Sequence, residues 1–401
     1  MNIAILTKDF FWGGGVDFIR LIVNALVLKS KEQNLTIHLL IPDDRKLTHI
    51  LDLFSMMARI FTHNKQDSTR KNQDFEIILR YRNEFQNINR SLKVVTYYNS
   101  KRGLIHCLKK NKFDALLPVL FFWGKDFPIP WIGYWADFQH KYYPEYFTSD
   151  ECLERDIVLA TTLRDTNAVI VNSKAVKNDI DKFYPYHQCR IFVLPFAPHP
   201  MDSWLNGTDV KIKEKYRLPE RFFLISNQLW IHKSHITAFE ALANMKDKSI
   251  HIVCTGHVHD YRFPRYFNDL KEKIKSLNIE KRVHFLGYIP KMDQISIMKE
   301  AVAVLQPTLF EGGPGGGAVH DAIALGIPAV VSDIPVNLEI EEANVFFFKS
   351  GSSEDMAKKM QMISECNQGL KSKEELLNKG LLRTHQLGDR LLEAIRYAIN
   401  H

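Results

Sequence analysis

Short apolar runs alternate with segments of helical spacing along most of this sequence. The runs are rich in β-branched residues and are bounded by glycine, proline or polar clusters, as expected for buried strands. We interpret as strands residues 2–7, 35–44, 92–98, 114–120, 166–173, 190–196, 221–228, 249–257, 282–290, 301–308 and 328–332. Because helices alternate with these strands, we predict an α/β fold built on parallel sheets.

The length of the chain indicates more than one domain. At 401 residues it is long for a single hydrophobic core, so two domains of about 200 residues are expected. Hydrophobic residues make up 45% of the chain, which is enough for two full cores. Residues 197–208 are rich in Pro, Gly, Asn and Asp. We therefore predict a first domain over residues 1–200, a linker, and a second domain that begins at residue 209.

The formal net charge of +7 is unevenly distributed. Between Lys65 and Lys110, eleven basic residues stand against four acidic ones, an excess of seven. This excess favours an anionic partner, such as membrane headgroups, a lipid-linked pyrophosphate acceptor or nucleic acid, although a solvated basic surface explains it equally well. No nucleic-acid-binding motif accompanies the charges, so we expect no nucleic-acid partner.

Next to this basic segment, apolar residues recur at helical spacing between Leu47 and Phe61. The pattern predicts an amphipathic helix, which either packs on the core, the more frequent case, or contacts a membrane interface. No apolar run reaches the roughly 18 residues needed to span a bilayer, and the chain begins with a strand rather than a signal peptide. We expect a cytoplasmic protein that is at most peripheral at the inner membrane face.

Cysteine and histidine spacing argues against a metal centre. The cysteines are odd in number and lack CxxC spacing, which is typical of free thiols in a reducing compartment. They are Cys107, Cys152, Cys189, Cys254 and Cys366. His257, His259 and Asp260 have a spacing that suits a metal, but a surface loop is the preferred interpretation. We expect neither a metal nor a bound cofactor.

The most informative stretch is VAVLQPTLFEGGPGGGAVHDAIALGIPAVVSD, residues 302–333. An apolar strand leads into a loop with five glycines, and a helix and another strand follow. In an open parallel sheet, ligands bind beyond the carboxyl ends of the strands, and glycines let the backbone approach an anion. Glu311 opens the loop and Asp321 lies on the helix behind it. Acids beside a phosphate site suit a ligand that also has hydroxyl groups, namely a nucleotide sugar.

This stretch resembles the signature of the retaining family-4 glycosyltransferases (glycosyl transferases group 1, GT-B fold), in which E-G-x-G precedes E-A-x-A-x-G-x-P. DAIALGIP matches the later half except that Asp321 replaces Glu, while Glu311 and Gly312 match the earlier half. Nine residues separate the two acids instead of seven, which puts sugar specificity in question. The resemblance implies that Glu311 and the loop amides contact the donor sugar and that Asp321 holds the ribose. The loop glycines are Gly312, Gly313, Gly315, Gly316 and Gly317.

The second domain carries further positions of this resemblance. Lys233 matches one of two cations that hold the pyrophosphate in the family, whereas the family's Arg falls on Gln228, and His232 or His235 is a candidate to compensate. The resemblance places the nucleobase near Gly287 and Tyr288. Asn337 and Glu339 follow the next strand, and the family's Glu lies at the cleft floor. The second domain would end near residue 385, with the helix at 386–401 crossing back to the first domain.

In the first domain, Gly13 to Gly15 lead from a strand into a helix, and the resemblance implies that Gly14 and Gly15 face the donor phosphates and the acceptor. Alone, these glycines equally well form a tight turn. The aromatic segment DFQHKYYPEYF, residues 137–147, is similar to a segment that borders the cleft in one branch of the family. The usual catalytic His of the family would fall on Ala136. His140 is the replacement candidate, with a core histidine as the alternative.

Together these features imply two Rossmann-like domains that face each other across a cleft. The implied activity is metal-independent, retaining transfer of a hexose-type sugar from a GDP- or UDP-sugar to a glycan or lipid-linked glycan acceptor, as in polysaccharide biosynthesis. The catalytic candidates are Glu311, Lys233 and His140. Two alternatives stay open: a nucleotide-sugar epimerase or hydrolase of the same fold, and a non-catalytic module that binds anionic surfaces.

Overall fold

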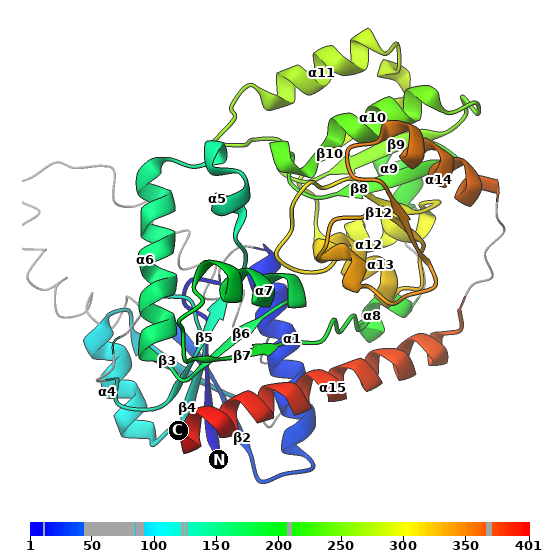
Figure 1. The fold of residues 1–401 in the computed structure, drawn as a ribbon. Helices are drawn as coiled ribbons and strands as arrows, with labels where there is room; N and C mark the ends of the chain where they lie inside the picture. The colour runs from blue at the N-terminus through cyan, green and yellow to red at the C-terminus, as the bar shows by residue number, and fades with distance from the viewer. Residues whose placement is uncertain are drawn as a thin grey trace, which may run out of the picture.

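The computed structural model describes residues 1–10, 13–43, 85, 92–121, 124, 127–206, 211–365 and 371–401. Within these residues the chain forms two α/β domains, each built on a parallel sheet (Figure 1). The predicted fold class is confirmed. The amphipathic helix expected at 47–62 and most of the basic segment lie outside the described residues.

In the described part of the first domain, seven parallel strands form one sheet. Their order is β3 (Leu92–Tyr98), β2 (Thr36–Asp43), β1 (Asn2–Leu6), β4 (Ala115–Val119), β5 (Trp131–Trp135), β6 (Ala168–Val171) and β7 (Arg190–Val193). The helical segments are α1 (Gly13–Ser30), α4 (Lys101–Asn111), α5 (Gln139–Tyr142), the 3-10 turn η1 (Pro144–Tyr146), α6 (Ser149–Asp165) and α7 (Lys174–Phe183). The central strands are apolar along their whole length because helices cover both faces of the sheet.

The second domain has six parallel strands in its described part. Their order is β10 (Val283–Gly287), β9 (His251–Thr255), β8 (Phe222–Ser226), β11 (Val304–Gln306), β12 (Ala329–Ser332) and β13 (Val345–Phe348). Its helices are α9 (Ile212–Tyr216), α10 (His235–Asn244), α11 (Tyr266–Ser276), α12 (Lys291–Glu300), α13 (Gly316–Ala324) and α14 (Ser353–Glu365), and its 3-10 turns are η2 (Ile231–Lys233), η3 (Glu280–Arg282) and η4 (Asn337–Glu339).

The strand order of the second sheet determines where a ligand can bind. The chain runs outward from β8 through β9 to β10 and then returns to add β11 on the other side of β8. The loops after β8 and β11 therefore leave the sheet in opposite directions and open a crevice at the carboxyl ends of the strands, the usual ligand position in such folds. Ser226 and Gln306 are the last residues of these two strands.

Helix starts in the first domain follow from local sequence. Ser173 caps the helix that follows β6, where its hydroxyl accepts a hydrogen bond from the Val176 amide at 3.1 Å. At the start of α6, Thr148 and Glu151 form a reciprocal capping box. These caps hold α6 and α7 at the edge of the sheet that faces the second domain.

The linker and the last helix join the two domains. The short helix α8 (Asp202–Leu205) lies in the linker, and α15 (Lys373–Asn400) runs from the second domain along α1 of the first (Figure 1). The crossing helix thus begins at Lys373, earlier than the expected residue 386. Close packing of α15 on α1 requires Gly388, because a Cβ there would lie 2.9 Å from the Ala25 carbonyl oxygen.

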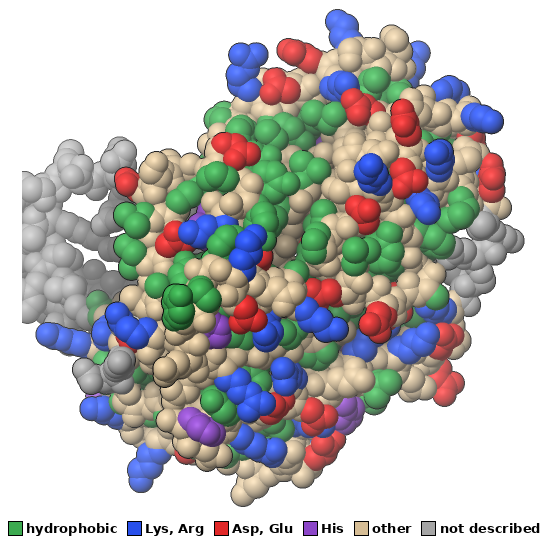
Figure 2. All heavy atoms as spheres, in the orientation of Figure 1, with side chains coloured by type: hydrophobic (Ala, Val, Ile, Leu, Met, Phe, Trp, Pro, Cys, Tyr) green, Lys and Arg blue, Asp and Glu red, His purple; other side chains and the backbone are tan. Residues whose placement is uncertain are grey.

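Aromatic side chains fill much of the contact between the domains. Figure 2 shows hydrophobic side chains gathered where α5 and η1 meet the second domain. Tyr143 packs edge-on against Phe310 with 6.1 Å between ring centroids, and Tyr146 packs edge-on against Phe263 at 5.3 Å. The aromatic segment at 137–147 therefore builds the domain interface.

Candidate active site

A cleft of about 1330 Å³ lies between the domains, with the carboxyl ends of β8, β9 and β11 on one side and α1 on the other. The first turns of two helices line it, α1 through Gly14 and α13 through Gly316 and Gly317. The first amides of a helix have no partner within the helix, and the helix dipole adds partial positive charge at that end. Two such ends beside one cleft make it suitable for an anionic ligand such as a pyrophosphate.

A chain of polar side chains crosses the switch point between β8 and β11. The Lys233 ammonium forms an ion pair with the Glu311 carboxylate. The Gln306 amide donates to the same carboxylate oxygen at 2.8 Å and accepts from the Asn227 side chain at 3.0 Å. Lys233 and Glu311 are 15% and 12% exposed, so solvent screens their interaction only weakly. The structure thus brings together two of the predicted catalytic residues.

Glycines shape the loop between Glu311 and α13. Gly315 and Gly316 have φ angles of +67° and +63°, a left-handed conformation that favours glycine. Gly316 lies directly under Glu311, because a Cβ there would be 3.4 Å from the carboxylate oxygen. The Gly315 amide donates to the fully buried Asn337 at 2.9 Å. Asn337 therefore holds the glycine loop in place through this hydrogen bond.

Not all of the loop glycines face the cleft. A Cβ on Gly312 would lie 2.1 Å from the Ala136 carbonyl oxygen of the first domain, and Ser173 donates to the Gly312 carbonyl at 3.2 Å. Gly313 lies beside Asn172. The two extra loop residues thus accompany a contact with the first domain. Gly312 and Gly313 are not among the residues that line the main cleft, so the structure does not support the expectation that they bind the donor.

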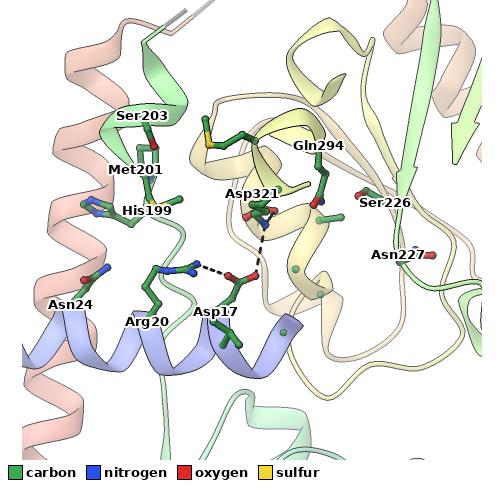
Figure 3. A pocket seen from close by; sticks show the side chains of 18 of the residues that line it. Asp17, Arg20, Asn24, His199, Met201, Ser203, Ser226, Asn227, Gln294 and Asp321 are labelled. Atoms are coloured by element: carbon green, nitrogen blue, oxygen red, sulfur yellow. Dashed lines mark hydrogen bonds and ion pairs between the residues drawn. The ribbon is translucent and has the colours of Figure 1, made fainter. Parts of the chain in front are cut away.

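Asp321 lies in a charged network that connects the two domains. It accepts from Lys291 at 2.5 Å, and Lys291 also lies 3.7 Å from Asp17 of α1, which pairs with Arg20 at 2.5 Å. Figure 3 shows Asp17 and Arg20 pointing across the cleft toward Asp321. Burial raises the pKa of Asp321 to about 6 even though the ammonium of Lys291 opposes the rise. Asp321 is therefore ionised at neutral pH and protonated in mild acid.

The two histidines near Lys233 do not replace the missing cation. Burial lowers the pKa of His232 to about 2 and that of His235 to about 3, and in both cases the neighbouring Lys233 lowers it further. Both rings are neutral at pH 7, so the expectation that they compensate for Gln228 is wrong. Gln228 itself lines the cleft and is exposed.

The loop after β10 forms one end of the cleft. Gly287 has a φ of +70° and accepts from the Gly256 amide at 2.9 Å, which joins the ends of β9 and β10. Tyr288 lines the cleft and stacks on His257 with 4.6 Å between ring centroids. Asp260 accepts from the backbone amides of η2 and its own loop, and the described residues contain no cluster of three metal-ligating side chains.

Gly14 and Gly15 of the first domain were both expected to face the donor, but only one of them lines the cleft. Gly14 lines the cleft as expected. Gly15 packs against the preceding loop, since a Cβ there would lie 2.8 Å from the Phe10 carbonyl oxygen. Its role in this structure is close packing between the loop and α1.

The structure does not bring His140 to the cleft. Its ring is 1% exposed and lies against α6, where Nε2 is 3.0 Å from Asp156 and Nδ1 accepts from Arg155 at 3.1 Å. Because Nδ1 accepts, the proton must be on Nε2, so the ring is neutral and both nitrogens are used. Burial lowers the pKa of His140, consistent with this state. His140 is therefore a core histidine, which was the alternative interpretation of this residue.

Glu339 also lies elsewhere than expected. Instead of lining the cleft floor, its carboxylate accepts from the backbone amides of Lys174 and Ala175, each at 2.8 Å. These are the first amides of α7 in the first domain, where a negative charge is favoured by the helix dipole. Glu339 therefore connects the domains.

Sequence reasoning missed several residues of the site. They are Asp17, Arg20, Asn227, Lys291 and Gln306. Asn227 and Gln306 each stand at the end of an apolar strand, which is a usable signal for a ligand-facing polar residue. Lys291, Asp17 and Arg20 lie on helix surfaces, where nothing in the local pattern separates them from solvated charges.

Comparison with known proteins agrees with this geometry. Residues 209–380 match the family model of the glycosyl transferases group 1. The match covers most of the second domain. Mannosylfructose-phosphate synthase of Agrobacterium fabrum is 26% identical to this chain over 182 residues, which are 44% of this chain and 37% of that protein. The match thus spans little more than a third of that relative.

Solved structures resemble the chain over almost its whole length. The crystal structure of Anabaena Alr3699/HepE in complex with UDP and glucose is 14% identical, with 99% of both chains covered and a TM-score of 0.61. Sucrose-phosphate synthase from Thermosynechococcus elongatus is 13% identical, with 100% of this chain and 97% of that chain covered and a TM-score of 0.61. At these identities the likeness shows the fold, so the chain has the two-domain GT-B architecture.

Proposed function

We propose that this protein transfers a hexose-type sugar from a nucleotide-sugar donor to a glycan or lipid-linked glycan acceptor, with retention at the anomeric carbon. The observation that carries the proposal is the pair of Lys233 and Glu311, held by Gln306 at the switch point of the second sheet. A cation for a phosphate and an acid for sugar hydroxyls lie side by side at the usual ligand position of the fold.

The donor would lie along the second domain. The base is placed near Tyr288, the ribose beside Asp321, the pyrophosphate at the first turn of α13 and Lys233, and the sugar at Glu311. A nucleotide-sugar donor is supported by a protein of the same fold whose crystal structure contains UDP and glucose. With Gln228 in place of a second cation, Lys291 is the other ammonium that the second domain presents to the cleft among the described residues.

The proposed reaction needs no protein base. The acceptor hydroxyl oxygen bonds to the anomeric carbon on the face that the phosphate leaves, the carbon–phosphate oxygen bond breaks, and the leaving phosphate takes the hydroxyl proton. Lys233 and the α13 amides stabilise the charge that grows on the phosphate, and Glu311 orients the sugar. A hydrogen bond to a charged group is worth about 1.5–3 kcal/mol, so each such contact contributes about tenfold to a hundredfold in rate.

The acceptor side includes a candidate membrane contact. The exposed face of α4 carries Lys101, Arg102, Lys109 and Lys110. Acidic residues are absent from this helix, so its field attracts anionic lipid headgroups. No helix in the described part of the chain has the length and apolar character that a bilayer span requires.

The donor assignment is tested by thermal stabilisation of the purified protein with UDP-, GDP- and ADP-sugars, because a ligand that binds the folded state raises the melting temperature. The sugars of one nucleotide should raise the melting temperature of the protein much more than the others do. The anomeric configuration of the product, read by proton NMR, tests retention, and turnover in excess EDTA tests metal independence. Release of free sugar at full rate without an acceptor would instead indicate a hydrolase or epimerase.

A further inference from the structure

A smaller cavity of about 270 Å³ opens off the main cleft on the side of the first domain. It lies between α1, the segment that follows β7, and the glycine loop. The two cavities are continuous, because many residues line both of them, including Gly14, Asp17, Arg20 and Asp321. Glu311 lines the smaller cavity, which places this cavity next to the position proposed for the donor sugar.

The walls of this cavity are mainly apolar. The side chains that form them come from three separate segments and are Phe18, Leu21, Phe196, Met201, Trp204 and Pro314. Polar and charged groups border the cavity in two places: Asp17, Arg20 and Asp321 line both this cavity and the main cleft, and Asn172 and Glu311 lie near the glycine loop. A ligand in this cavity would therefore meet hydrocarbon walls with a few polar groups around them, as in many small-molecule sites.

The aromatic walls are held in place by their neighbours. Phe18 stacks on Tyr134 with 4.5 Å between ring centroids, and Tyr134 accepts a hydrogen bond from Asn172 at 2.7 Å. Phe196 packs against the His320 ring with 5.4 Å between centroids. These contacts fix the rings in the cavity wall, so binding requires little reorganisation of them.

We propose that this cavity binds a ring-sized apolar group of the acceptor, immediately next to the hydroxyl that receives the sugar. The inference rests on the proposed glycosyl transfer and specifies its acceptor. The position supports it, because the cavity is at the carboxyl ends of β6 and β7 and is lined by Glu311, the residue proposed to orient the donor sugar. The size supports it too, since small-molecule pockets range from about 300 to 1,000 Å³ and a smaller one suits a single ring rather than a long chain.

The test compares glucosides that differ only in the group at the anomeric oxygen: methyl, octyl and 4-nitrophenyl β-D-glucopyranoside. Binding is measured by titration calorimetry, without nucleotide and again with UDP, GDP or ADP present. We expect the 4-nitrophenyl glucoside to bind at least about tenfold more tightly than the methyl glucoside, because filling an apolar pocket is worth that much. Equal affinities, binding of none of the three, or preference for octyl over 4-nitrophenyl would overturn the proposal.

Two variants test whether the preference for the 4-nitrophenyl glucoside arises in this cavity. Leu21→Asn places a polar group in the wall, and its control is Leu153→Asn, an exposed position on α6 that is 57% accessible. Leu21→Asn should reduce the 4-nitrophenyl to methyl ratio about tenfold, and Leu153→Asn should leave it unchanged. The ratio is taken within one variant, so partial unfolding does not alter it. An unchanged ratio in Leu21→Asn would overturn the proposal.

Failure of this proposal and failure of the proposed function give different results. If no nucleotide stabilises the protein, the donor assignment fails whatever the glucosides do. If a nucleotide stabilises it but the three glucosides bind alike, glycosyl transfer stands and the apolar acceptor site does not. Both measurements use the whole 401-residue chain.

Discussion

Glu339 of the second domain accepts a hydrogen bond from the backbone amide of Lys174 in the first domain at 2.8 Å. The other carboxylate oxygen accepts from the next amide of the same helix. A carboxylate at a helix start is favourable for the helix, and this one also joins two domains that must stay aligned across the cleft. The contact is therefore the first to test by mutation.

We predict that Glu339→Ala lowers the free energy of unfolding by about 1 kcal/mol, the usual cost of losing a helix cap. The melting temperature should fall by about 2–4 °C. The control is Glu341→Ala, an exposed acid two positions away, which should have no effect. Equal melting temperatures for the two variants in differential scanning calorimetry would show that the interdomain contact contributes nothing.

Glu311→Gln should leave the fold intact and reduce transfer about a hundredfold or more, because the amide keeps the volume but not the charge beside Lys233. Steady-state rates with the stabilising nucleotide sugar provide the measurement, and circular dichroism checks the fold. Glu272→Gln, at an exposed site on α11, is the matched control. Wild-type turnover in Glu311→Gln would remove Glu311 from the active site.

Lys233→Met should lower kcat/KM about tenfold to a hundredfold, since it removes one charged contact to the leaving phosphate. The variant also leaves Glu311 without its cation. Adding a cation by Gln228→Arg should strengthen nucleoside diphosphate binding, because Gln228 lines the same cleft. If Gln228→Arg weakens binding, the pyrophosphate does not lie between these two positions.

Nucleotide binding should weaken below about pH 6. Burial raises the pKa of Asp321 to about 6, so its carboxylate gains a proton as the pH falls through this value and can no longer accept two ribose hydroxyls. Phosphate groups of the ligand also titrate near pH 6. The informative quantity is thus the difference in nucleotide binding free energy between wild type and Asp321→Asn, measured by calorimetry from pH 5 to pH 8. This difference should be largest above pH 7 and vanish near pH 5; a constant difference would argue against a ribose contact.

Reversal of Lys101, Arg102, Lys109 and Lys110 to Glu should abolish binding to vesicles that contain anionic lipid. Binding by the wild type should fall as salt rises, because exposed charges are screened over about 8 Å at physiological ionic strength. Donor hydrolysis should not change, since the proposed donor site lies in the second domain. The control reverses exposed lysines of the second domain, Lys271, Lys275, Lys281 and Lys358. If the wild type binds anionic and neutral vesicles equally at low salt, the basic face of α4 is a solvent-exposed surface that does not bind anionic lipid.

Local patterns in the sequence were sufficient to predict the fold class and the loop that identifies the family. Apolar β-branched runs must be buried wherever they fall, and a glycine loop with an acid between a strand and a helix is a contiguous signal. Ser173 is another such case, because a helix cap involves only the next three residues. These features depend on neighbours in the chain, so no knowledge of the fold was required.

The pairings within the site depend on strand order instead. Lys233 and Glu311 are 78 positions apart and meet because β11 inserts beside β8, and Asp321 meets Lys291 of another helix 30 positions away. His140 and Glu339 were assigned to the cleft by resemblance, yet the fold turns one into the first-domain core and the other onto α7. A side chain's burial and charge state are set by residues from distant segments, and a linear sequence does not specify which of these segments will be adjacent.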